Sequence, residues 1–442
     1  MNVAIIGMGF VGLSLAVVLA DKKIHVYGVE SDEQKIRKLN LGKSTFFEPK
    51  LQNLLEKSIN SRNLEFTNSV ESVFNKSDIF FVTVGTPTKN NQIDLSGIKK
   101  SIITLANLLA DSSKKPLIVI KSTIAPGTTK KIIKTTLEKK PSQIMGKDFF
   151  LVTNPEFLRE GNAIKDQKDP HVIVIGAEDK KSKQLMTSFY KKIYPKRIPR
   201  IITNFPTSEL IKYSNNAYLA TKISFINTIS NLCQQIDGAN IDEVAKVIGM
   251  DPRIGSLFLR AGPGFGGSCL PKDLTSFISV YQQFGLTPKL LTSVKNVNEE
   301  QINNIDQILK KKLFTLQGKT ISILGLSFKE NSDDIRESRS ILLIKKLLKN
   351  KMKLKVHDPK AIPNTKKIFQ NKIQYFSKIS DCVNNSHCTI IMTPWKNYSN
   401  LSFKTLEKMK SPIVLDTRRI LKNPPKNIDY IAYGINQNNK TK

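Results

Sequence analysis

The opening segment of this chain constrains the fold more than any other. A short apolar run at 3–6 leads straight into the glycine-rich sequence GMGFVG, and a second apolar run at 25–29 ends at Glu30. This spacing predicts a buried strand, a tight turn and a helix, then a second strand with an acidic residue at its end. Such a βαβ unit is typical of dinucleotide-binding proteins. A glycine-containing turn without a ligand is the alternative, and the presence of strand, loop, helix and acid in register disfavours it.

The residues of this segment also indicate which dinucleotide it binds. The glycines permit a tight turn and let a pyrophosphate approach the backbone at the N-terminus of the helix. A carboxylate at Glu30 suits the two ribose hydroxyls and would repel a 2′-phosphate. We therefore predict NAD, and not NADP, as the cofactor, held by Gly7, Gly9, Phe10, Val11, Gly12 and Glu30.

Short apolar runs recur along the chain and alternate with helical segments. They lie at 3–6, 25–29, 79–84, 117–120, 149–152 and 172–175, and after Gly318 at 321–324, 354–357, 389–392 and 413–415. This alternation is typical of doubly wound parallel sheets, whose ligands bind at the carboxyl ends of the strands. Between the two regions, residues 208–237 run without Pro or Gly and with apolar residues near helical spacing, which predicts one long helix.

We therefore predict an α/β protein with two Rossmann-like doubly wound parallel-sheet domains joined by a central all-helical domain that contains the long helix. A chain of 442 residues has the length of two or three domains. The predicted divisions are an N-terminal NAD-binding Rossmann domain, a central helical domain, a C-terminal Rossmann-like domain and a frayed polar tail, at 1–204, 205–312, 313–435 and 436–442.

The two sheet regions resemble each other loosely in sequence. VAIIGMGFVG corresponds to ISILGLSFKE at 321–330, and IHVYGVE corresponds to LKVHDP, each with an acidic residue just past the strand. Only the first glycine of the loop persists in the second copy, and Lys329 stands where the first copy has Val11. We expect only the first copy to bind the dinucleotide.

The charge of the chain is strongly basic. It has 69 lysines and arginines against 37 acidic residues, a formal net charge of +32. A nucleic-acid-binding protein is the alternative function class that this charge suggests. The lysines, however, are spread through every helix and loop, without interleaved aromatic residues, and 40% hydrophobic residues exclude a disordered polycation. We expect no nucleic-acid partner, and neutralising lysines far from the active site should leave turnover unchanged.

The cysteines favour a reducing compartment. Cys233, Cys269, Cys382 and Cys388 show no CxxC spacing, which disfavours a zinc site, and we predict no metal. The segment 3–20 is apolar enough to suggest a signal peptide or a membrane span, but three glycines interrupt it and no basic residue precedes it. We expect a cytoplasmic protein without a membrane partner.

The stretch GPGFGGSCLPKD at 262–273 is too rich in Gly and Pro for regular structure, and such loops bring the backbone close to a ligand. By itself Cys269 is more often an inert buried thiol. Its neighbours favour reactivity, because Lys272 can favour the thiolate and Asp273 can handle a proton. A thiolate beside NAD can trap an aldehyde as a thiohemiacetal, which loses hydride and becomes a thioester for water to cleave.

Two further pairs of polar residues are candidates for chemistry. Lys212 and Asn216 share a face of the long helix, where an ammonium and a carboxamide suit an alkoxide or oxyanion; a solvated polar stripe is the alternative. Glu156 and Glu160 follow a predicted strand in NPEFLREG, a position suited to a general base. For this second pair a surface salt bridge is the alternative.

These segments together resemble the UDP-glucose/GDP-mannose dehydrogenase family over nearly the whole chain. Eight ordered motifs carry the resemblance: GMGFVG, VGTPT at 84–88, KSTIAPGT at 121–128, NPEFLREG at 154–161, the helix ELIKYSNNAYLA, MDPRIG at 250–255, GFGGSCLPKD and GLSFKENSDDIRES at 325–338. The resemblance implies an enzyme that oxidises the C6 alcohol of a sugar nucleotide to a carboxylate. Two NAD and one water are consumed, and the aldehyde is not released.

The resemblance also implies roles for individual residues. Cys269 is the nucleophile and Glu156 the general base for thioester hydrolysis, and four residues assist at the C6 oxygen, the water or the cofactor: Lys212, Asn216, Asp273 and Thr123. Further cofactor contacts are implied for Lys35, Thr86, Thr123, Glu160, Lys272 and Arg336. Substrate contacts are implied for Glu156, Phe157, Leu158, Arg159, Glu160, Lys212, Asn216, Arg260, Gly262, Phe265, Gly266, Lys329 and one of Arg418 and Arg419.

The motifs also bear on the sugar and on assembly. GGSCLPKD resembles the UDP-glucose and GDP-mannose branches of the family, and MDPRIG favours UDP-glucose. GDP-mannose is the main alternative, and a UDP-N-acetylhexosamine the lesser one. Arg253 matches an arginine that reaches the sugar nucleotide in a neighbouring subunit, which implies a homodimer or higher oligomer. A catalytically silent relative is disfavoured because every residue that the chemistry needs is present.

Overall fold

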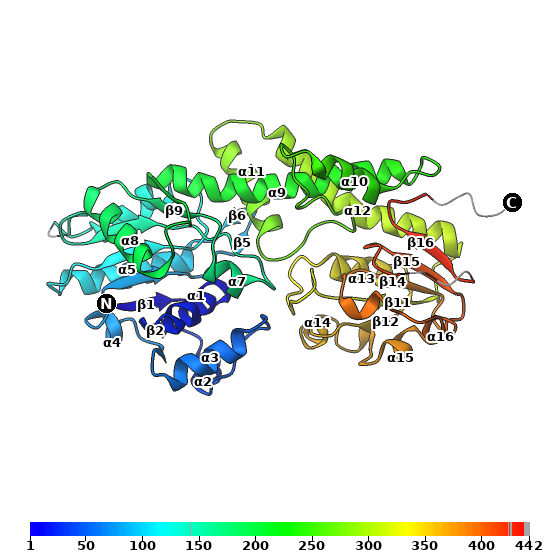
Figure 1. Cartoon of the computed structure of the whole chain (residues 1–442), viewed down its shortest axis with the longest axis horizontal. Helices are drawn as coiled ribbons and strands as arrows, with labels where there is room; N and C mark the ends of the chain where they lie inside the picture. Colours follow the sequence, from blue (N-terminus) through cyan, green and yellow to red (C-terminus); the bar gives the residue numbers. More distant parts are fainter. Residues whose placement is uncertain (142, 423, 425–426, 437–442) are drawn as a thin grey trace. The chain divides into compact units, whose positions relative to one another are not determined.

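The computed structural model describes residues 1–141, 143–422, 424 and 427–436. The chain divides into two compact units, Met1–Asn215 and Asn216–Lys442. Both units have the predicted α/β character, with a parallel sheet in each and helices between them in sequence (Figure 1). The boundaries of the three predicted domains stay a prediction. Of the predicted tail, 437–442 lie outside the described residues, and the Asn436 backbone N–H donates to the Ala239 carbonyl oxygen at 3.2 Å.

The first unit contains an eight-stranded sheet in the order β10-β9-β8-β7-β4-β1-β2-β3. Its strands are β1 (Asn2–Ile6), β2 (His25–Val29), β3 (Leu64–Thr67), β4 (Ile79–Val82), β7 (Leu117–Ile120), β8 (Phe150–Thr153), β9 (Ile173–Gly176) and β10 (Arg200–Thr203). The pairing is parallel except where β8 meets β9 at a single antiparallel pair, Thr153 with Gly176. Six of the strands follow the apolar runs of the sequence. β3 and β10 do not, because they are edge strands with exposed residues.

Helices cover both faces of this sheet, as expected for a doubly wound fold. Val3 and Ile5 of β1 pack in one apolar cluster with α1 and α8, whereas Ala4 and Ile6 pack in another with α5. The helices are α1 (Phe10–Asp21), α2 (Glu33–Asn40), α3 (Leu51–Asn60), α4 (Glu71–Phe74), α5 (Ser96–Ala110), the π-helical η1 (Thr129–Lys134), α6 (Thr135–Leu137), α7 (Ala163–Lys168) and α8 (Lys180–Ile193). A small hairpin joins β5 (Thr88–Lys89) and β6 (Gln92–Ile93).

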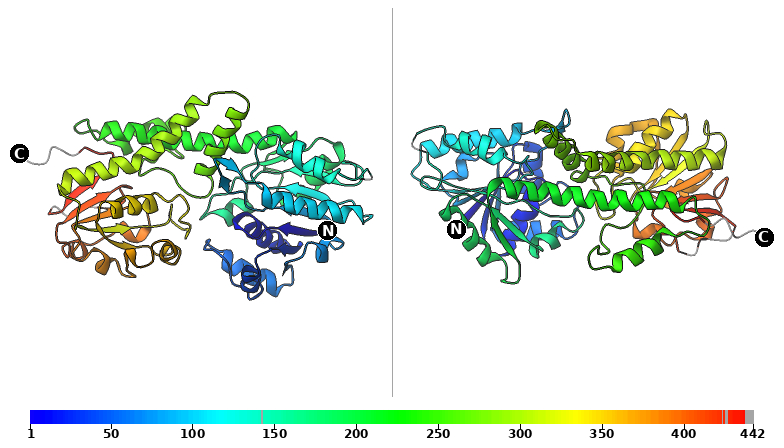
Figure 2. Two further views of the ribbon diagram at one scale, coloured as in Figure 1. Left: turned by 180° about the vertical axis from the view of Figure 1, so that it is seen from behind. Right: turned by 90° about the horizontal axis from the view of Figure 1, so that it is seen from above.

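The predicted long helix is α9 (Phe205–Cys233), which is continuous through the division between the units (Figure 2). In the second unit it is followed by α10 (Ile241–Met250), α11 (Leu270–Gln283) and α12 (Lys289–Leu313). One face of α12 packs with the C-terminal sheet and α13 (Arg339–Lys349) in a single apolar cluster. The C-terminal half of the helical segment therefore shares a core with the second sheet.

The second sheet has six strands in the order β13-β12-β11-β14-β15-β16, all paired in parallel. The strands are β11 (Thr320–Leu324), β12 (Lys353–His357), β13 (Gln374–Tyr375), β14 (Cys388–Ile391), β15 (Ile413–Asp416) and β16 (Asp429–Ala432). The remaining helical segments are α14 (Ile362–Phe369), η2 (Gln370–Lys372), α15 (Ile379–Val383), η3 (Lys396–Tyr398) and α16 (Phe403–Leu406). The sequence did not predict the edge strands β13 and β16.

The two sheets repeat one local arrangement after their first strands. Glu30 accepts the Met8 N–H at 3.2 Å, and Asp358 accepts the Leu326 N–H at 2.7 Å. The copies differ in where the next helix begins. Helix α1 begins at Phe10, directly after the first loop, whereas α13 begins at Arg339, well beyond Gly325. Only the first copy therefore places a helix N-terminus directly after its glycine loop.

Candidate active site

The glycine loop after β1 is shaped by two close approaches of the backbone. Gly7 has φ of 99°, and a Cβ there would lie 3.1 Å from the backbone of Val84. A Cβ on Gly12 would lie 1.9 Å from the Gly7 carbonyl oxygen. The Thr83 hydroxyl donates to the same carbonyl at 2.7 Å and holds the turn in place. Gly9 caps α1, and nothing lies within 4 Å of a Cβ built there. The start of α1 is thus open on the side that a pyrophosphate needs.

Glu30 is positioned beside this loop. Its carboxylate is buried and accepts the backbone N–H of Met8 at 3.2 Å and that of Asp32 at 3.1 Å. The Lys35 ammonium lies 3.7 Å from Glu30 Oε2. A carboxylate held here by backbone donors, next to the open glycine loop, fits an adenosine ribose. The residues of the first unit therefore fit NAD.

Three loops meet at the carboxyl ends of β4, β7 and β8. The Thr86 hydroxyl donates to the Thr123 carbonyl at 2.9 Å, and the Ser122 hydroxyl donates to the Val84 carbonyl at 2.7 Å. Thr123 also lines a small pocket with Glu209 and Lys212 of α9. The motifs VGTPT and KSTIAPGT therefore lie side by side, as the parallel order of β4 and β7 requires.

Glu156 and Lys212 form a buried ion pair in the first unit. The Lys212 ammonium lies 2.9 Å from Glu156 Oε1, with side-chain exposures of 5% and 7%. Burial alone would raise the pKa of Glu156, but Lys212, the Leu158 N–H and Lys121 together hold it below its usual value. This burial excludes the solvated stripe for Lys212 and the surface salt bridge for Glu156.

The other residues of NPEFLREG differ in their surroundings. The Phe157 ring lies 5.5 Å from the Lys212 ammonium and so faces the ion pair. Arg159 instead pairs with Asp166 through Nε at 2.9 Å and Nη2 at 2.6 Å, which raises the pKa of its guanidinium. Glu160 is buried. A substrate that uses Arg159 would have to share it with Asp166.

Asp273 is the centre of a second polar cluster, in the second unit. Its carboxylate is 1% exposed and accepts a hydrogen bond from Asn216 Nδ2 at 2.6 Å and one from the Lys272 ammonium. Cys269 immediately precedes α11, and its carbonyl accepts the Asp273 N–H at 2.8 Å. Cys269 is partly exposed, whereas Cys233, Cys382 and Cys388 are buried. Cys269 is therefore the most accessible thiol of the four.

The glycine-rich loop before Cys269 packs against the C-terminal sheet region of the same unit. The Phe265 N–H donates to Asn298 Oδ1 at 2.7 Å, and Arg339 Nε donates to the Phe265 carbonyl at 2.8 Å. A Cβ on Gly266 would lie 2.2 Å from the Glu337 carbonyl oxygen. The Gly267 N–H donates to the Arg336 carbonyl at 2.9 Å. Backbone and side-chain contacts therefore fix the path of the loop at several points.

The predicted substrate-binding arginines have distinct partners. Arg419 is buried, and its three nitrogens donate to Asp242 at 2.9 Å and to the carbonyls of Tyr433 and Ala261 at 2.7 and 3.0 Å. Arg418 is half-buried, and burial, with Arg260 and Arg419 nearby, lowers its pKa to about 10. The Arg418 guanidinium also lies against Gly262.

Three further predicted residues lie towards solvent. Arg336 pairs with Asp334 at 2.6 Å and is 64% exposed, and Arg253 pairs with Asp251 at 2.6 Å and is 86% exposed. Lys329 is partly exposed. An exposed ion pair contributes little free energy, so an anionic ligand can recruit such a charge at low cost.

Comparison with known proteins identifies the family. Three family models match in order, all described as UDP-glucose/GDP-mannose dehydrogenase family: the NAD binding domain at residues 1–194, the central domain at 206–300 and the UDP binding domain at 322–423. A UDP-glucose 6-dehydrogenase of Rickettsia bellii is 38% identical, and the match covers 96% of this chain and 96% of that protein. The UDP-glucose 6-dehydrogenase TuaD of Bacillus subtilis is 37% identical, and the match covers 95% of this chain and 89% of that protein.

A solved structure gives the same result. The UDP-glucose dehydrogenase of the archaeon Pyrobaculum islandicum superposes with a TM-score of 0.91 at 30% identity, and the match covers 98% of both chains. The chain belongs to the UDP-glucose/GDP-mannose dehydrogenase family. It is an NAD-dependent dehydrogenase, and the predicted fold class and cofactor are confirmed.

The dehydrogenase groups its predicted residues in two places. In the first unit the structure brings together the NAD loop with Glu30 and Lys35, and the Glu156–Lys212 pair with Thr123. In the second unit it brings together Asn216, Lys272 and Asp273 next to Cys269. Lys212 and Asn216 are one turn apart in the sequence of α9.

Sequence reasoning missed three buried residues of this dehydrogenase. Glu209 accepts the N–H of Gly127 and, at 2.8 Å, that of Thr129, and so anchors the KSTIAPGT loop. Glu48 accepts the N–H of Gly161 at 2.7 Å and holds the end of NPEFLREG. Lys121 is the third. A charged residue directly after an all-apolar strand was the signal for Lys121, and Glu209 opens the motif ELIKYSNNAYLA; for Glu48 the sequence held no signal.

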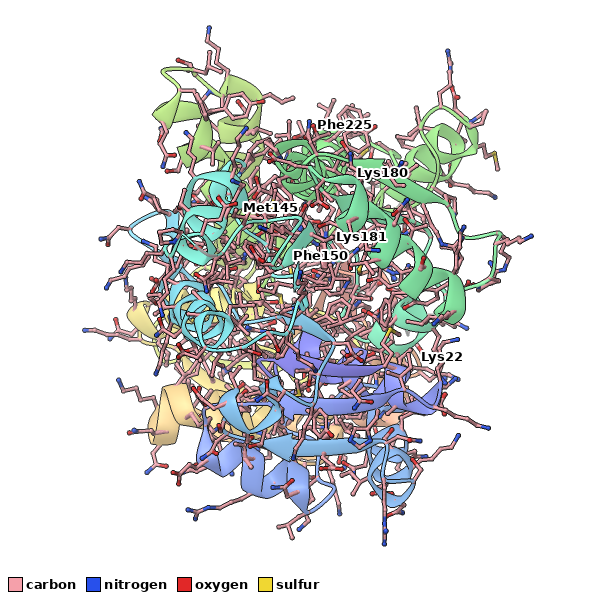
Figure 3. All side chains as sticks on the ribbon, turned by 90° about the vertical axis from the view of Figure 1, so that its left-hand side faces the viewer. Lys22, Met145, Phe150, Lys180, Lys181 and Phe225 are labelled. Atoms are coloured by element: carbon pink, nitrogen blue, oxygen red, sulfur yellow. The ribbon has the colours of Figure 1, made fainter. Side chains whose placement is uncertain are left out.

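The excess lysine of the dehydrogenase lies largely at its surface. Lys22, Lys180 and Lys181 are exposed on the first unit (Figure 3). The apolar segment at 3–20 is strand β1 and most of helix α1. Among the residues that the structure describes, no helix is long and apolar enough to cross a membrane. The same residues contain no group of three or more His, Cys, Asp or Glu side chains that could hold a metal ion.

Gly12 offers a direct test of the cofactor loop. In Gly12→Ala the new methyl group would lie 1.9 Å from the Gly7 carbonyl oxygen and 2.6 Å from Thr83 Oγ1, so the turn must open. We expect a stability loss of about 2 kcal/mol and roughly tenfold weaker NAD binding. Thermal unfolding and an NADH fluorescence titration measure the two effects. Gly85→Ala, where nothing lies within 4 Å of the added Cβ, is the control for stability. Equal behaviour of the two variants would contradict the steric argument.

Proposed function

We propose that this dehydrogenase oxidises the C6 alcohol of UDP-glucose to the carboxylate of UDP-glucuronate. The observation that carries the proposal is the partly exposed Cys269 beside the buried cluster around Asp273, in a chain that also has the NAD loop. The family model for residues 322–423 describes a UDP binding domain, and the relatives from Rickettsia bellii and Bacillus subtilis are named for UDP-glucose. These observations favour UDP-glucose over GDP-mannose and UDP-N-acetylhexosamines.

NAD, when bound, accepts one hydride in each of two oxidations. In the first, the C6 alcohol loses its proton to the protein and becomes an aldehyde. The Cys269 thiolate then adds to the aldehyde carbon, and the resulting thiohemiacetal is oxidised to a thioester. Water cleaves the carbon–sulfur bond of the thioester, supplies the second carboxylate oxygen and returns the thiolate. The balance is one alcohol, one water and two NAD to one carboxylate, two NADH and three protons.

The polar residues have complementary roles in this proposal. Lys212 and Asn216 donate hydrogen bonds to the negative oxygen on C6, and Asp273 exchanges its proton. Asp273 is suited to this role because Asn216 and Lys272 fix both of its carboxylate oxygens. Thr123 lines the same pocket as Lys212 in the first unit, and we assign it a supporting role in the same chemistry. Glu156, kept ionised by its neighbours, takes the proton of the attacking water.

Further contacts complete the proposed ligand sites. We assign the cofactor to the NAD loop, Glu30 and Lys35, with contributions from Thr86, Glu160, Lys272 and Arg336. We assign the sugar nucleotide to the NPEFLREG segment and the 260–266 loop, with Lys329 near the diphosphate. The proposed location is the cytoplasm, which supplies NAD and keeps Cys269 reduced; cell fractionation tests it.

Arg418 and Arg419 have different roles in this proposal. Every nitrogen of the Arg419 guanidinium donates to a protein group, so we assign the substrate contact to Arg418. Arg418→Ala is expected to raise KM for UDP-glucose by about tenfold or more, because a charged hydrogen bond is worth about 1.5–3 kcal/mol. Arg419→Ala is expected to lower the stability by about 2 kcal/mol, because it leaves buried carbonyls without donors. Steady-state kinetics and urea unfolding compare the two; the reverse pattern would exchange the assignments.

We also propose that the enzyme is a homodimer or higher homo-oligomer, with Arg253 acting in the neighbouring subunit. Tyr218, Phe225 and Leu232 are exposed and spaced seven apart on α9, so they form one apolar stripe on that helix (Figure 3 labels Phe225). Arg253 is exposed near the end of α10. Analytical ultracentrifugation tests the assembly, and a monomer at micromolar concentration would exclude it.

A substrate panel tests the proposed function. UDP-glucose, GDP-mannose and UDP-N-acetylhexosamines are each incubated with the enzyme and NAD, and NADH absorbance is followed to completion. We expect turnover of UDP-glucose with two NADH per sugar. Turnover of GDP-mannose alone would overturn the substrate assignment. One NADH per sugar would overturn the double oxidation.

A further inference from the structure

Lys121 is a buried lysine for which the proposed mechanism has no use. It directly follows β7, and its side chain is 5% exposed. Its ammonium donates to Asn154 Oδ1 at 2.9 Å. The Tyr190 hydroxyl on α8 donates to the same oxygen, and Asn154 Nδ2 donates to the Val174 carbonyl at 2.7 Å. The Asn154 amide is thus oriented with its oxygen towards Lys121.

A neutral acceptor does not explain why this position carries a charge. Burying an ammonium costs free energy unless a negative group compensates it. Burial lowers the pKa of Lys121 to about 8; the Glu156 carboxylate acts against this change, and the Lys212 ammonium adds to it. Lys121 therefore lies within electrostatic reach of the Glu156–Lys212 pair. A glutamine would satisfy Asn154 without the cost of the charge, so the charge itself needs a reason.

The reason lies in the demands on Glu156. In the ground state its carboxylate accepts hydrogen bonds from the Lys212 ammonium on α9 and from the Leu158 backbone N–H, and the charge of Lys121, at the end of β7, also favours the carboxylate form. In the proposed reaction Lys212 donates to the negative oxygen on C6, which weakens its hold on Glu156. A buried carboxylate that loses its partner takes up a proton and is then no base. A second cation, held away from the substrate, prevents this.

We propose that Lys121 is a positioning residue that keeps Glu156 in its carboxylate form while Lys212 serves the C6 oxygen. The place of this role in the reaction rests on the proposed function. Asn154 fixes the ammonium, and it lies two residues before Glu156 in the same loop, so both ends of the interaction move together. Tyr190, which shares the Asn154 oxygen, stays neutral because burial raises its pKa well above the usual value. Glu209, also buried on α9, has a raised pKa, chiefly because of burial.

Substitutions at Lys121 separate its charge from its hydrogen bond. Lys121→Gln keeps a donor for Asn154 and removes the charge, Lys121→Met removes both, and Lys121→Arg keeps both. Tyr190→Phe is the matched control, because it removes a donor from the same oxygen without changing any charge. The pKa of Glu156 is measured by difference infrared spectroscopy of its carboxyl band, assigned with Glu156→Gln. This measurement needs neither substrate nor turnover.

Loss of the charge should raise the pKa of Glu156 by about one pH unit, because a nearby cation favours the carboxylate. The acid limb of the kcat profile should then move to higher pH by the same amount in Lys121→Gln and Lys121→Met. In Lys121→Arg and Tyr190→Phe the pKa of Glu156 and the acid limb of the kcat profile should both stay at their wild-type values. A purely structural role would lower stability in all variants without moving the limb.

The outcomes are distinguishable from those of the proposed function. An unchanged pKa of Glu156 in either folded uncharged variant overturns the role of Lys121, whatever the activity. An equal shift of the pKa of Glu156 in Tyr190→Phe also overturns the role of Lys121, because the effect would then come from the orientation of Asn154 and not from the charge. If the wild type fails to oxidise UDP-glucose, the proposed function is wrong, and the infrared titration still decides whether Lys121 controls Glu156.

Discussion

Cys269→Ala is expected to reduce the four-electron oxidation of UDP-glucose by about a thousandfold or more. A nucleophile that acts together with its neighbours carries much of the rate, and its loss leaves only their binding and electrostatic effects. No covalent intermediate can form without the sulfur. NADH production gives the rate, and mass spectrometry of acid-quenched enzyme shows whether a sugar-nucleotide adduct lies on the peptide that contains Cys269.

Two variants sharpen this experiment. Cys269→Ser keeps the shape of the side chain and is also expected to lose turnover, because an alcohol is far less ionised than a thiol at neutral pH. Cys233→Ala is the matched control: Cys233 is buried in an apolar cluster of the helical segment, and its loss should cost some stability and leave turnover unchanged. If Cys269→Ser formed glucuronate at the normal rate, the covalent mechanism would be wrong.

Glu156→Gln should trap the enzyme at the thioester. Both oxidations precede hydrolysis, so the first turnover should release a burst of two NADH per active site. Steady turnover should then fall by about a hundredfold or more, the contribution typical of a general base. Stopped-flow absorbance measures the burst, and mass spectrometry after quenching should show the uronyl adduct on Cys269. The substitution also leaves Lys212 without its carboxylate, so some loss of stability accompanies it.

Glu56→Gln is the control for the change of charge, because Glu56 is an exposed residue of α3. It should show neither a burst nor slower turnover. A Glu156→Gln enzyme that lost both oxidations equally, with no burst, would move Glu156 from hydrolysis to an earlier step. Normal turnover in this variant would remove it from the mechanism and would leave Lys121 without a function.

Much of the fold could be predicted because local chemistry dictates it. In the GMGFVG loop a Cβ on Gly12 would strike the Gly7 carbonyl oxygen, so this part of the glycine pattern follows from contacts within six residues. Buried central strands appear as apolar runs because both of their faces are covered by helices. Edge strands such as β3 and β10 keep exposed residues, so their composition does not distinguish them from loops.

The candidate site shows the same division. The motifs identify Cys269, Lys212 and Glu156 because rare residue types stand at characteristic spacings. They do not indicate that Lys212 pairs with Glu156, 56 residues away, or that Lys121 donates to Asn154, 33 residues away. They also leave Arg418 and Arg419 equivalent, although only Arg419 has every guanidinium nitrogen bound to a protein group.

The sequence by itself determined the two sheet regions, the NAD loop, the long helix and the residue types available for chemistry, because each depends on periodic burial or on sterics within a few residues. The tertiary structure alone decided which of those residues meet. Strand order brings the ends of β7 and β8 together, and α9 packs Lys212 against the loop after β8. Charge interactions act over a few ångströms in space and not along the chain, so the buried lysine beside the proposed base emerged only from the folded structure.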